Sequence, residues 1–215
     1  MGPNIASPLG HGLMWGWEKG DQSPHIVVMA GPNGAGKSTT APMLLRQFFG
    51  VVDYVNADTI AAGLSAFAPE KAARQAGRIM LRELHRLHAK GGNFAFETTL
   101  ATRSYAPWLI KCQNEGYRVN LLFLALSSPD VAVARVAERV RNGGHDVPRE
   151  IIRRRFHRGL VNFFTLYRPV LDRWFLIDNS LAALPGIVAY GGLGIEPIVP
   201  QSGAYALLEK QYGRK

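Results

Sequence analysis

The sequence has a single cysteine, Cys112, among its 215 residues. One cysteine cannot form an intramolecular disulfide, which excludes the small secreted folds that disulfides hold together and fits a reducing compartment. No run of about 18 apolar residues occurs, so we predict no membrane-spanning helix. Residues 1–24 lack the basic start and continuous apolar core of a signal peptide, and we expect a loosely ordered N-terminal arm there. These absences favour a cytoplasmic protein.

Acidic residues are few in comparison with basic ones: 16 Asp and Glu stand against 25 Lys and Arg, a net charge of +9. Such an excess favours an anionic partner. The basic residues concentrate between Arg135 and Arg173, where polyphosphate chemistry would need them as much as nucleic-acid binding would. The charge alone does not decide between the two, and from the motifs below we do not expect nucleic acid as a partner.

Strand-like and helix-like patterns alternate through most of the chain. Apolar runs predict strands at 26–30, 51–55, 94–96, 118–126 and 174–177. Helices are predicted between them, at 37–49, 70–90, 103–115, from 129 to the Gly143-Gly144 pair, and at 148–168. This alternation predicts an α/β fold, with a parallel five-stranded sheet flanked by helices. We place a single domain at 25–200 and a C-terminal tail at 201–215.

The strongest motif is the glycine-rich stretch from Gly31 to Ser38, which reads G-x-x-x-x-G-K-S directly after an apolar run. A strand, a glycine loop and a helix that begins at Lys37 form the context of the phosphate-binding loop (P-loop) of nucleoside triphosphatases. Backbone N–H groups and the helix N-terminus bind phosphates, the lysine reaches the β/γ-phosphates, and the Ser38 hydroxyl can hold Mg²⁺. We therefore predict that the chain binds a nucleoside triphosphate together with Mg²⁺. The predicted nucleotide-binding residues are Gly31, Asn33, Gly34, Ala35, Gly36, Lys37, Ser38 and Thr39.

Three predicted strands are followed by an acid: Asp58, Glu97 and Asp178. In open α/β sheets ligands bind at the carboxyl ends of the strands, although an acid there can also be a turn or capping residue. Asp58 is the candidate base that accepts the proton of an attacking hydroxyl, or alternatively a carboxylate near Mg²⁺. Glu97 precedes Thr98 and Thr99, a combination that suits binding of a polyol or sugar.

Arginines are dense over a predicted helix, a Gly-Gly break and a second helix, a region that we interpret as a lid at about 135–158. Guanidinium groups on such a lid can close on a triphosphate and stabilise transition-state charge. The alternative is a solvated basic face. The arginines concerned are Arg135, Arg139, Arg141, Arg149, Arg153, Arg154, Arg155 and Arg158.

Several blocks in this order resemble the zeta-toxin family, kinases of toxin–antitoxin systems with an adenylate-kinase-like core. The blocks are GPNGAGKST at 31–39, VNADTIA at 55–61, FETTLA at 96–101, SSPDVAVARVAERVRNGGHDVP at 127–148, IRRRFHRGL at 152–160 and DNS at 178–180. The resemblance, to a compact chromosomal branch, implies ATP/Mg²⁺-dependent phosphorylation of a sugar hydroxyl of UDP-N-acetylglucosamine. It also implies an antitoxin protein as a partner.

Residue by residue, the resemblance implies that Lys37 and Ser38 belong to the phosphate loop and that Asp58 is the catalytic aspartate. Glu97 and Thr99 match the pair that holds the sugar nucleotide. Arg141 and Arg154 are the best matches to two catalytic lid arginines, with Arg139, Arg153 and Arg155 in near register. Thr98 stands where family toxins commonly have glycine, which leaves the acceptor open. The alternatives are a kinase of another small molecule or of a nucleic-acid end, or a non-catalytic ATP-binding regulator that contacts nucleic acid.

Overall fold

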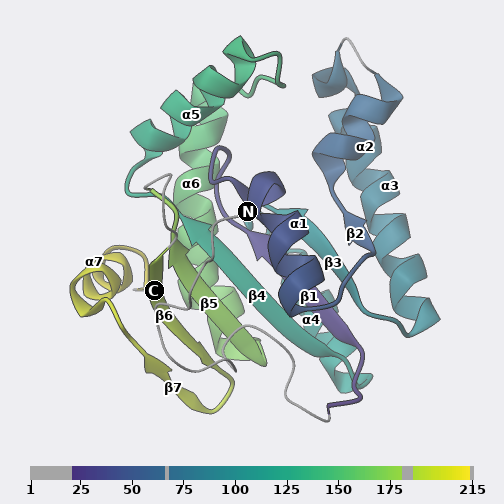
Figure 1. The fold of residues 1–215 in the computed structure, drawn as a ribbon, viewed down its shortest axis with the longest axis vertical. Helices are drawn as coiled ribbons and strands as arrows, with labels where there is room; N and C mark the ends of the chain where they lie inside the picture. Colours follow the sequence, from purple (N-terminus) through teal and green to yellow (C-terminus); the bar gives the residue numbers. More distant parts are fainter. Residues whose placement is uncertain (1–20, 66–67, 181–185, 214–215) are drawn as a thin grey trace, which may run out of the picture.

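The structure, a computed structural model, describes residues 21–65, 68–180 and 186–213 (Figure 1). Its centre is a seven-stranded sheet in the order β2-β3-β1-β4-β5-β6-β7. The strands are β1 (His25–Ala30), β2 (Tyr54–Val55), β3 (Phe94–Thr98), β4 (Arg118–Ala125), β5 (Arg173–Asp178), β6 (Gly186–Gly192) and β7 (Ile195–Ile198). Most of the expected N-terminal arm, residues 1–24, lies outside the described residues.

The five strands from β2 to β5 pair in parallel, which confirms the predicted α/β core. Beyond the predicted five, β6 and β7 extend the sheet as antiparallel strands. Glycines hide β6 from sequence patterns because glycine is disfavoured in strands. Close packing requires one of them: a Cβ on Gly191 would lie 2.9 Å from the indole ring of Trp174.

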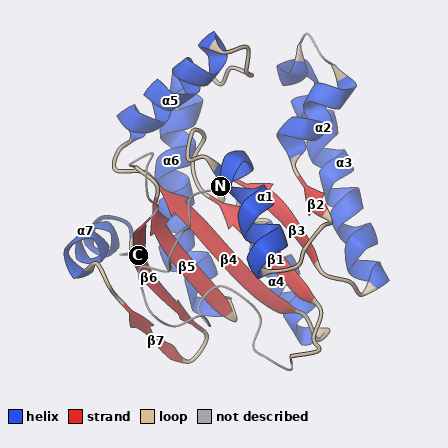
Figure 2. Cartoon of the chain, in the orientation of Figure 1, coloured by secondary structure: helices blue, strands red, loops and turns tan. Residues whose placement is uncertain are grey.

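Helices cover both faces of the sheet (Figure 2): α1 crosses one face, and α4 and α6 lie on the other. A π-helical turn and a 3₁₀ turn follow α6, at Phe163–Tyr167 and Arg168–Val170. The helices are α1 (Lys37–Phe48), α2 (Ala57–Leu64), α3 (Pro69–Lys90), α4 (Tyr105–Asn114), α5 (Pro129–Arg141), α6 (Arg149–Asn162) and α7 (Ser202–Tyr212).

The helix α7 occupies the region that the sequence predicts as a tail. It contacts β6 and α6. Arg168 bonds Glu209 at 2.8 Å, and the Tyr212 hydroxyl lies 3.2 Å from Nδ1 of His157. The end of the described chain is therefore packed onto the domain.

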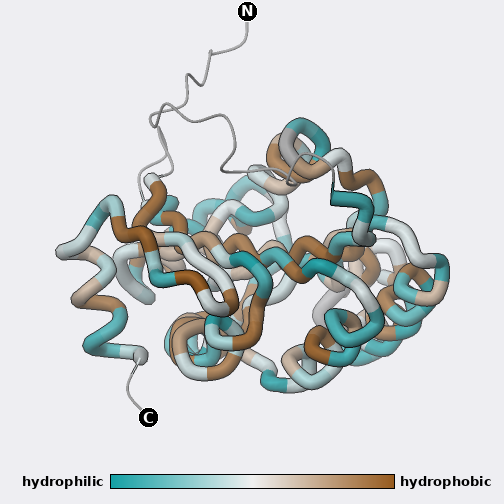
Figure 3. The backbone as a smooth tube through the Cα atoms, turned by 90° about the horizontal axis from the view of Figure 1, so that it is seen from below, coloured by the Kyte–Doolittle hydropathy of each residue, from teal (hydrophilic) through white to brown (hydrophobic). Residues whose placement is uncertain are grey.

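The core follows the strands: all six residues of β1 are buried, as are seven of the eight residues of β4. Figure 3 shows hydrophobic segments through the middle of the molecule and hydrophilic segments on the outer helices. Among the described residues, no helix has the length and apolar composition needed to cross a lipid bilayer. Because β1, β3, β4 and β5 run in parallel, the loops after them meet at one edge of the sheet. The α5–α6 and α2–α3 pairs rise on the two sides of this edge (Figure 1).

Candidate active site

The phosphate loop connects β1 to α1 and adopts a backbone that only glycine accommodates at two points. Gly31 has φ 139°, and a Cβ there would lie 2.3 Å from the carbonyl oxygen of Leu124 on β4. Gly36, immediately before α1, has φ 80°, and its Cβ would lie 2.9 Å from the side-chain nitrogen of Asn179. Both positions combine a left-handed backbone with a close neighbour. The glycines of the motif are thus explained by local geometry.

Lys37 is buried beneath this loop. Its Nζ donates to the carbonyl oxygens of Gly31 and Pro32, both at 2.9 Å, and lies 3.6 Å from Oε1 of Glu97. Burial lowers the pKa of Lys37, and the negative charges of Glu97 and Asp58 oppose that shift. A bound phosphate chain would offer charged oxygens in place of the neutral carbonyls.

Glu97, at the end of β3, faces the phosphate loop. Its Oε2 accepts hydrogen bonds from Ser38 Oγ at 2.8 Å, from the Tyr54 hydroxyl at 2.6 Å and from Asn56 Nδ2 at 2.8 Å. The resemblance implies that Glu97 holds the acceptor together with Thr99. The structure brings this carboxylate to Ser38 and Lys37 of the phosphate loop, and its role toward an acceptor stays a prediction.

The threonines after Glu97 lie in a tightly held turn. Thr98 Oγ1 accepts a hydrogen bond from the backbone N–H of Leu100, a buried residue with φ 58°. The carbonyl of Thr99 lies against α6, where a Cβ on Gly159 would approach it to 2.6 Å. Asn162 Nδ2 donates to the carbonyl of Leu100 at 2.8 Å. The loop after β3 is therefore fixed by α6, and Thr99 is half-buried in it and outside the lining of the cavity described below.

A cavity of about 250 Å³ opens above the phosphate loop. It brings together the P-loop, two of the three predicted acids and two arginines of α5. Its lining residues are Asn33, Gly34, Gly36, Lys37, Ser38, Thr39, Asp58, Glu97, Arg135 and Arg139. Asp58 is exposed in the first turn of α2, three residues beyond the end of the predicted strand at Val55. Asn56 caps this helix by accepting a hydrogen bond from the Asp58 N–H.

The arginines of the predicted lid divide into those that reach the site and those that do not. Arg139 lines the cavity, half-buried, and donates to the carbonyl of His145 at 2.7 Å. On α6, Arg155 Nη1 lies 3.4 Å from Asn33 Oδ1 of the phosphate loop. Burial lowers the pKa of Arg155, and the nearby charge of Asp58 opposes the shift. Arg139 therefore borders the cavity, and Arg155 lies against the phosphate loop.

Arg141 and Arg154, the pair that the resemblance implies, are exposed and do not line the cavity. Arg153 forms an ion pair with Asp130, on the outer side of the α5–α6 pair. The family resemblance identifies the arginine-rich segment. It does not show which arginines point into the cavity, because that depends on the position of each residue around its helix.

The residues that follow β5 form hydrogen bonds that support the phosphate loop, a role that the sequence alone does not predict. Asn179 Nδ2 donates to the carbonyl of Ala35 at 2.7 Å. Arg135 donates to the carbonyls of Asn179 and Ser180 at 2.8 and 2.7 Å. Asp178, the last residue of β5, accepts from the Ser180 N–H at 2.8 Å and is absent from the cavity lining, so we assign it to stabilising the turn after the strand.

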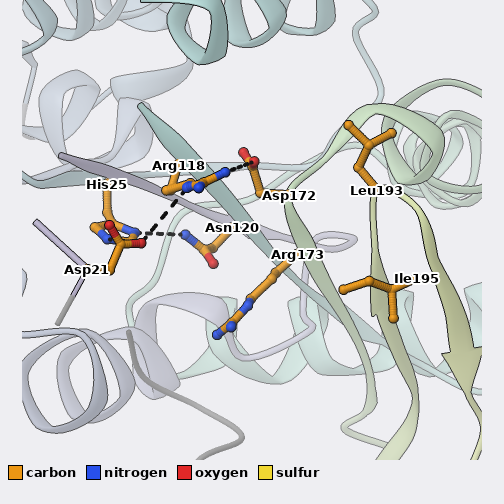
Figure 4. Close-up of a pocket in the computed structure, with 8 residues that line it drawn as sticks. All are labelled: Asp21, His25, Arg118, Asn120, Asp172, Arg173, Leu193 and Ile195. Carbon is orange, nitrogen blue, oxygen red and sulfur yellow. Dashed lines mark hydrogen bonds and ion pairs between the residues drawn. The ribbon is translucent and has the colours of Figure 1, made fainter. Parts of the chain in front are cut away.

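A second cavity, of about 270 Å³, lies at the opposite ends of the strands (Figure 4). Asp172 dominates its polar wall, accepting from Gln113 Nε2 at 2.7 Å, from the Val119 N–H at 2.8 Å and from Arg118 at 3.2 Å. Asp21 lies 3.6 Å from His25. These groups neutralise one another and join the starts of β1, β4 and β5, so we assign them a structural role.

The parallel core, the glycine loop and the buried lysine define a P-loop protein of the kinase-like class. The chain belongs to the zeta-toxin family, whose model, described as Zeta toxin, matches residues 16–173. An uncharacterised protein of Haemophilus influenzae is 28% identical over 132 residues, which cover 60% of this chain and 91% of the relative. Family and phosphate loop together support ATP-dependent phosphoryl transfer.

Solved structures share the fold at low sequence identity. The crystal structure of AvrRxo1-ORF1 with ORF2 and ATP superimposes with a TM-score of 0.69 at 16% identity, over 86% of this chain and 63% of that one. The chain therefore spans less than two thirds of that protein. The PezAT chromosomal toxin–antitoxin system of Streptococcus pneumoniae gives a TM-score of 0.54 at 18% identity, over 75% of this chain and 70% of that one.

Proposed function

We propose that the protein is an ATP- and Mg²⁺-dependent kinase that transfers the γ-phosphoryl group to a sugar hydroxyl of UDP-N-acetylglucosamine. The observation that carries the kinase assignment is the arrangement of charges around one cavity. Lys37, Ser38 and Glu97 form its nucleotide side, and the carboxylate of Asp58 lines the same space. The choice of acceptor rests on the family resemblance.

The nucleotide side is suited to a triphosphate with a divalent cation. The buried ammonium of Lys37 and the N–H groups of the loop would bind phosphate oxygens. Mg²⁺ prefers oxygen ligands and is usually bound together with substrate phosphates. The Ser38 hydroxyl and the neighbouring Glu97 carboxylate provide such oxygens. Magnesium bound there would neutralise charge on the β- and γ-phosphates.

Phosphoryl transfer needs one group that takes the proton of the acceptor hydroxyl. We assign this role to Asp58, because it is the carboxylate of the cavity that Ser38, Tyr54 and Asn56 do not engage. The hydroxyl oxygen forms a bond to the γ-phosphorus as the bond to the ADP oxygen breaks, and Asp58 takes the proton. Arg139 and Arg155 stabilise the charge that is shared between the two oxygens.

The acceptor would approach between Asp58 on α2 and the loop that contains Thr99. We assign Thr99 and Asp58 to acceptor binding. An antitoxin partner is part of this proposal, supported by family membership and by the PezAT and AvrRxo1-ORF1:ORF2 structures, which are complexes of two proteins. A reducing cytoplasm is also part of it, since Cys112 is free and buried.

The test is a direct assay of the purified protein with ATP, Mg²⁺ and UDP-N-acetylglucosamine, followed by mass spectrometry. The proposal predicts formation of ADP and a sugar nucleotide that carries one additional phosphate, and loss of both products with Asp58→Asn. If UDP-N-acetylglucosamine stays unmodified while another hydroxyl compound of a metabolite extract is phosphorylated, the acceptor is wrong and the kinase assignment stands. If no compound is phosphorylated, the kinase assignment is wrong.

A further inference from the structure

The carboxylate of Glu97 is held by two side chains from the end of a neighbouring strand. Tyr54 begins the two-residue strand β2, which pairs in parallel with β3 so that Tyr54 lies opposite Ala95. Asn56 follows two residues later, so its side chain returns to the same side of the chain. Both side chains thereby reach the last residues of β3, where Glu97 stands.

The contacts at Glu97 are short and converge on one oxygen. The Tyr54 hydroxyl at 2.6 Å and Asn56 Nδ2 at 2.8 Å donate to Oε2, beside Ser38 Oγ at 2.8 Å. The side chain of Glu97 is only 10% exposed. Hydrogen bonds to an ionised group inside a protein are stronger than neutral ones and fix its direction.

These contacts also orient the serine. A hydroxyl has one proton to donate, and Ser38 gives it to Glu97. Asn56 Nδ2 also donates to Ser38 Oγ, at 3.4 Å, which leaves one lone pair of the serine for the cavity that it lines. A cation beside the phosphates needs oxygen lone pairs in that direction. Without Tyr54 and Asn56, the carboxylate could turn away and the serine hydroxyl could rotate.

We propose that Tyr54 and Asn56 are positioning residues that hold Glu97 on Ser38 and thereby couple Mg²⁺ to nucleotide binding. This inference rests on the proposed function. Glu97 then acts on the metal side of the site, and acceptor recognition is left to Asp58 and the loop around Thr99. The second oxygen of Glu97 agrees with this assignment, because it lies 3.6 Å from Nζ of Lys37 in the phosphate loop.

Tyr54→Phe is the cleanest variant, since it removes one hydroxyl and keeps the ring. Tyr105→Phe is its matched control: Tyr105 is also half-buried, but among the described residues its hydroxyl has one partner, the sulfur of Met80 at 3.9 Å. Asn56→Asp is a second variant. It keeps the oxygen that caps α2 and replaces the amide donor to Glu97 by a like charge.

The measurement is the dissociation constant for ATP by titration calorimetry, once with saturating Mg²⁺ and once with EDTA. In the wild type, Mg²⁺ should strengthen binding. Tyr54→Phe should reduce that strengthening by about five- to tenfold, because a hydrogen bond to a charged group is lost. Affinity in EDTA should remain within about twofold of the wild type, as should both values for Tyr105→Phe, since the phosphate loop itself is unchanged. Asn56→Asp should reduce the strengthening further.

Equal weakening in Mg²⁺ and in EDTA would mean that Tyr54 is merely structural, and an unchanged Mg²⁺ effect would refute the proposal. A double variant sharpens the test: in a Glu97→Gln background, Tyr54→Phe should have no further effect on the Mg²⁺ ratio, because the two residues act through one contact. A full additional effect would overturn the link. Wild-type protein that binds no ATP in either buffer would instead overturn the proposed function, and this inference with it.

Discussion

The side chain of Asn179 donates a hydrogen bond of 2.7 Å to the backbone carbonyl of Ala35, joining the end of β5 to the phosphate loop across 144 positions of the chain. A Cβ on Gly36 would touch the same amide. The backbone of Asn179 is in turn held by Arg135 of α5. The loop that we assign to ATP therefore keeps its shape through contacts with the α5–α6 pair and with the sheet.

Asn179→Ala should weaken ATP binding and leave the fold intact. The variant removes the donor to Ala35 and lets the phosphate loop relax, a loss of about 1–1.5 kcal/mol or roughly tenfold in affinity. Titration calorimetry with ATP measures the effect. Asn142→Ala, an exposed substitution at the end of α5, is the control and should bind ATP as the wild type does. Equal ATP affinity for both variants would show that the contact does not shape the loop.

The lid arginines give a prediction with matched controls on the same two helices. Arg139→Ala and Arg155→Ala should each lower kcat by about 10²-fold, because we assign both guanidinium groups to the charge that develops on the transferred group. Arg141→Ala and Arg154→Ala should stay within about twofold, since both side chains are exposed and outside the cavity lining. Steady-state kinetics on the four variants show which pair of arginines, Arg139 and Arg155 or Arg141 and Arg154, contributes to catalysis. The reverse pattern would restore the pair implied by the family resemblance.

Asp58→Asn should separate binding from chemistry. The amide cannot accept the acceptor's proton, so kcat should fall by about 10²-fold or more while the dissociation constant for ATP stays close to that of the wild type. Calorimetry and rapid-quench measurements on the same preparation report the two quantities. If affinity and Mg²⁺ dependence change together with kcat, Asp58 belongs to the metal environment and is not the base.

His25 predicts a pH dependence of stability. Burial lowers its pKa below the ordinary value of about 6.5, and Asp21 opposes that shift while Arg118 and Arg173 reinforce it. The unfolded chain therefore takes up a proton at a pH where the folded protein does not. The free energy of unfolding should fall as pH drops below about 6.5, by at most ~1.4 kcal/mol per pH unit from this group.

Urea unfolding between pH 7.5 and pH 5 measures this slope. His25→Gln has no titrating ring and should show a shallower slope over the same interval, whatever its absolute stability. An identical slope in the two proteins would mean that other groups control the acid side of the stability curve.

The sequence predicts those parts of the molecule that depend on the pattern of neighbouring residues. The P-loop and the five parallel strands follow from apolar runs and glycines, and the structure confirms this fold. The lid arginines are different, because Arg139 and Arg141 are two residues apart and point roughly 200° apart around α5. A shift of two positions along the helix therefore decides whether a guanidinium lines the cavity or is exposed to solvent.

Contacts between segments that are far apart in the sequence could not be predicted from local sequence patterns either. Glu97 is recognisable as a strand-end acid, but its partners Tyr54 and Asn56 come from a strand of only two residues. Asn179 donates a hydrogen bond to Ala35, although the two residues are 144 positions apart in the sequence. Such pairs depend on strand order, which places β2 beside β3 and β5 beside β4.

Phosphoryl transfer from ATP by the wild type and by Lys37→Ala tests the central claim most directly. Each protein is incubated with Mg²⁺ and ATP labelled at the γ-phosphate, together with a metabolite extract, and transfer of the label to an organic hydroxyl is followed. Within the described part of the chain, the Lys37 ammonium bonds two loop carbonyls and approaches Glu97, so the variant should fold, as circular dichroism can verify. We predict transfer by the wild type and none above background by the variant. Transfer at an equal rate by both proteins would contradict the assignment of this loop to ATP.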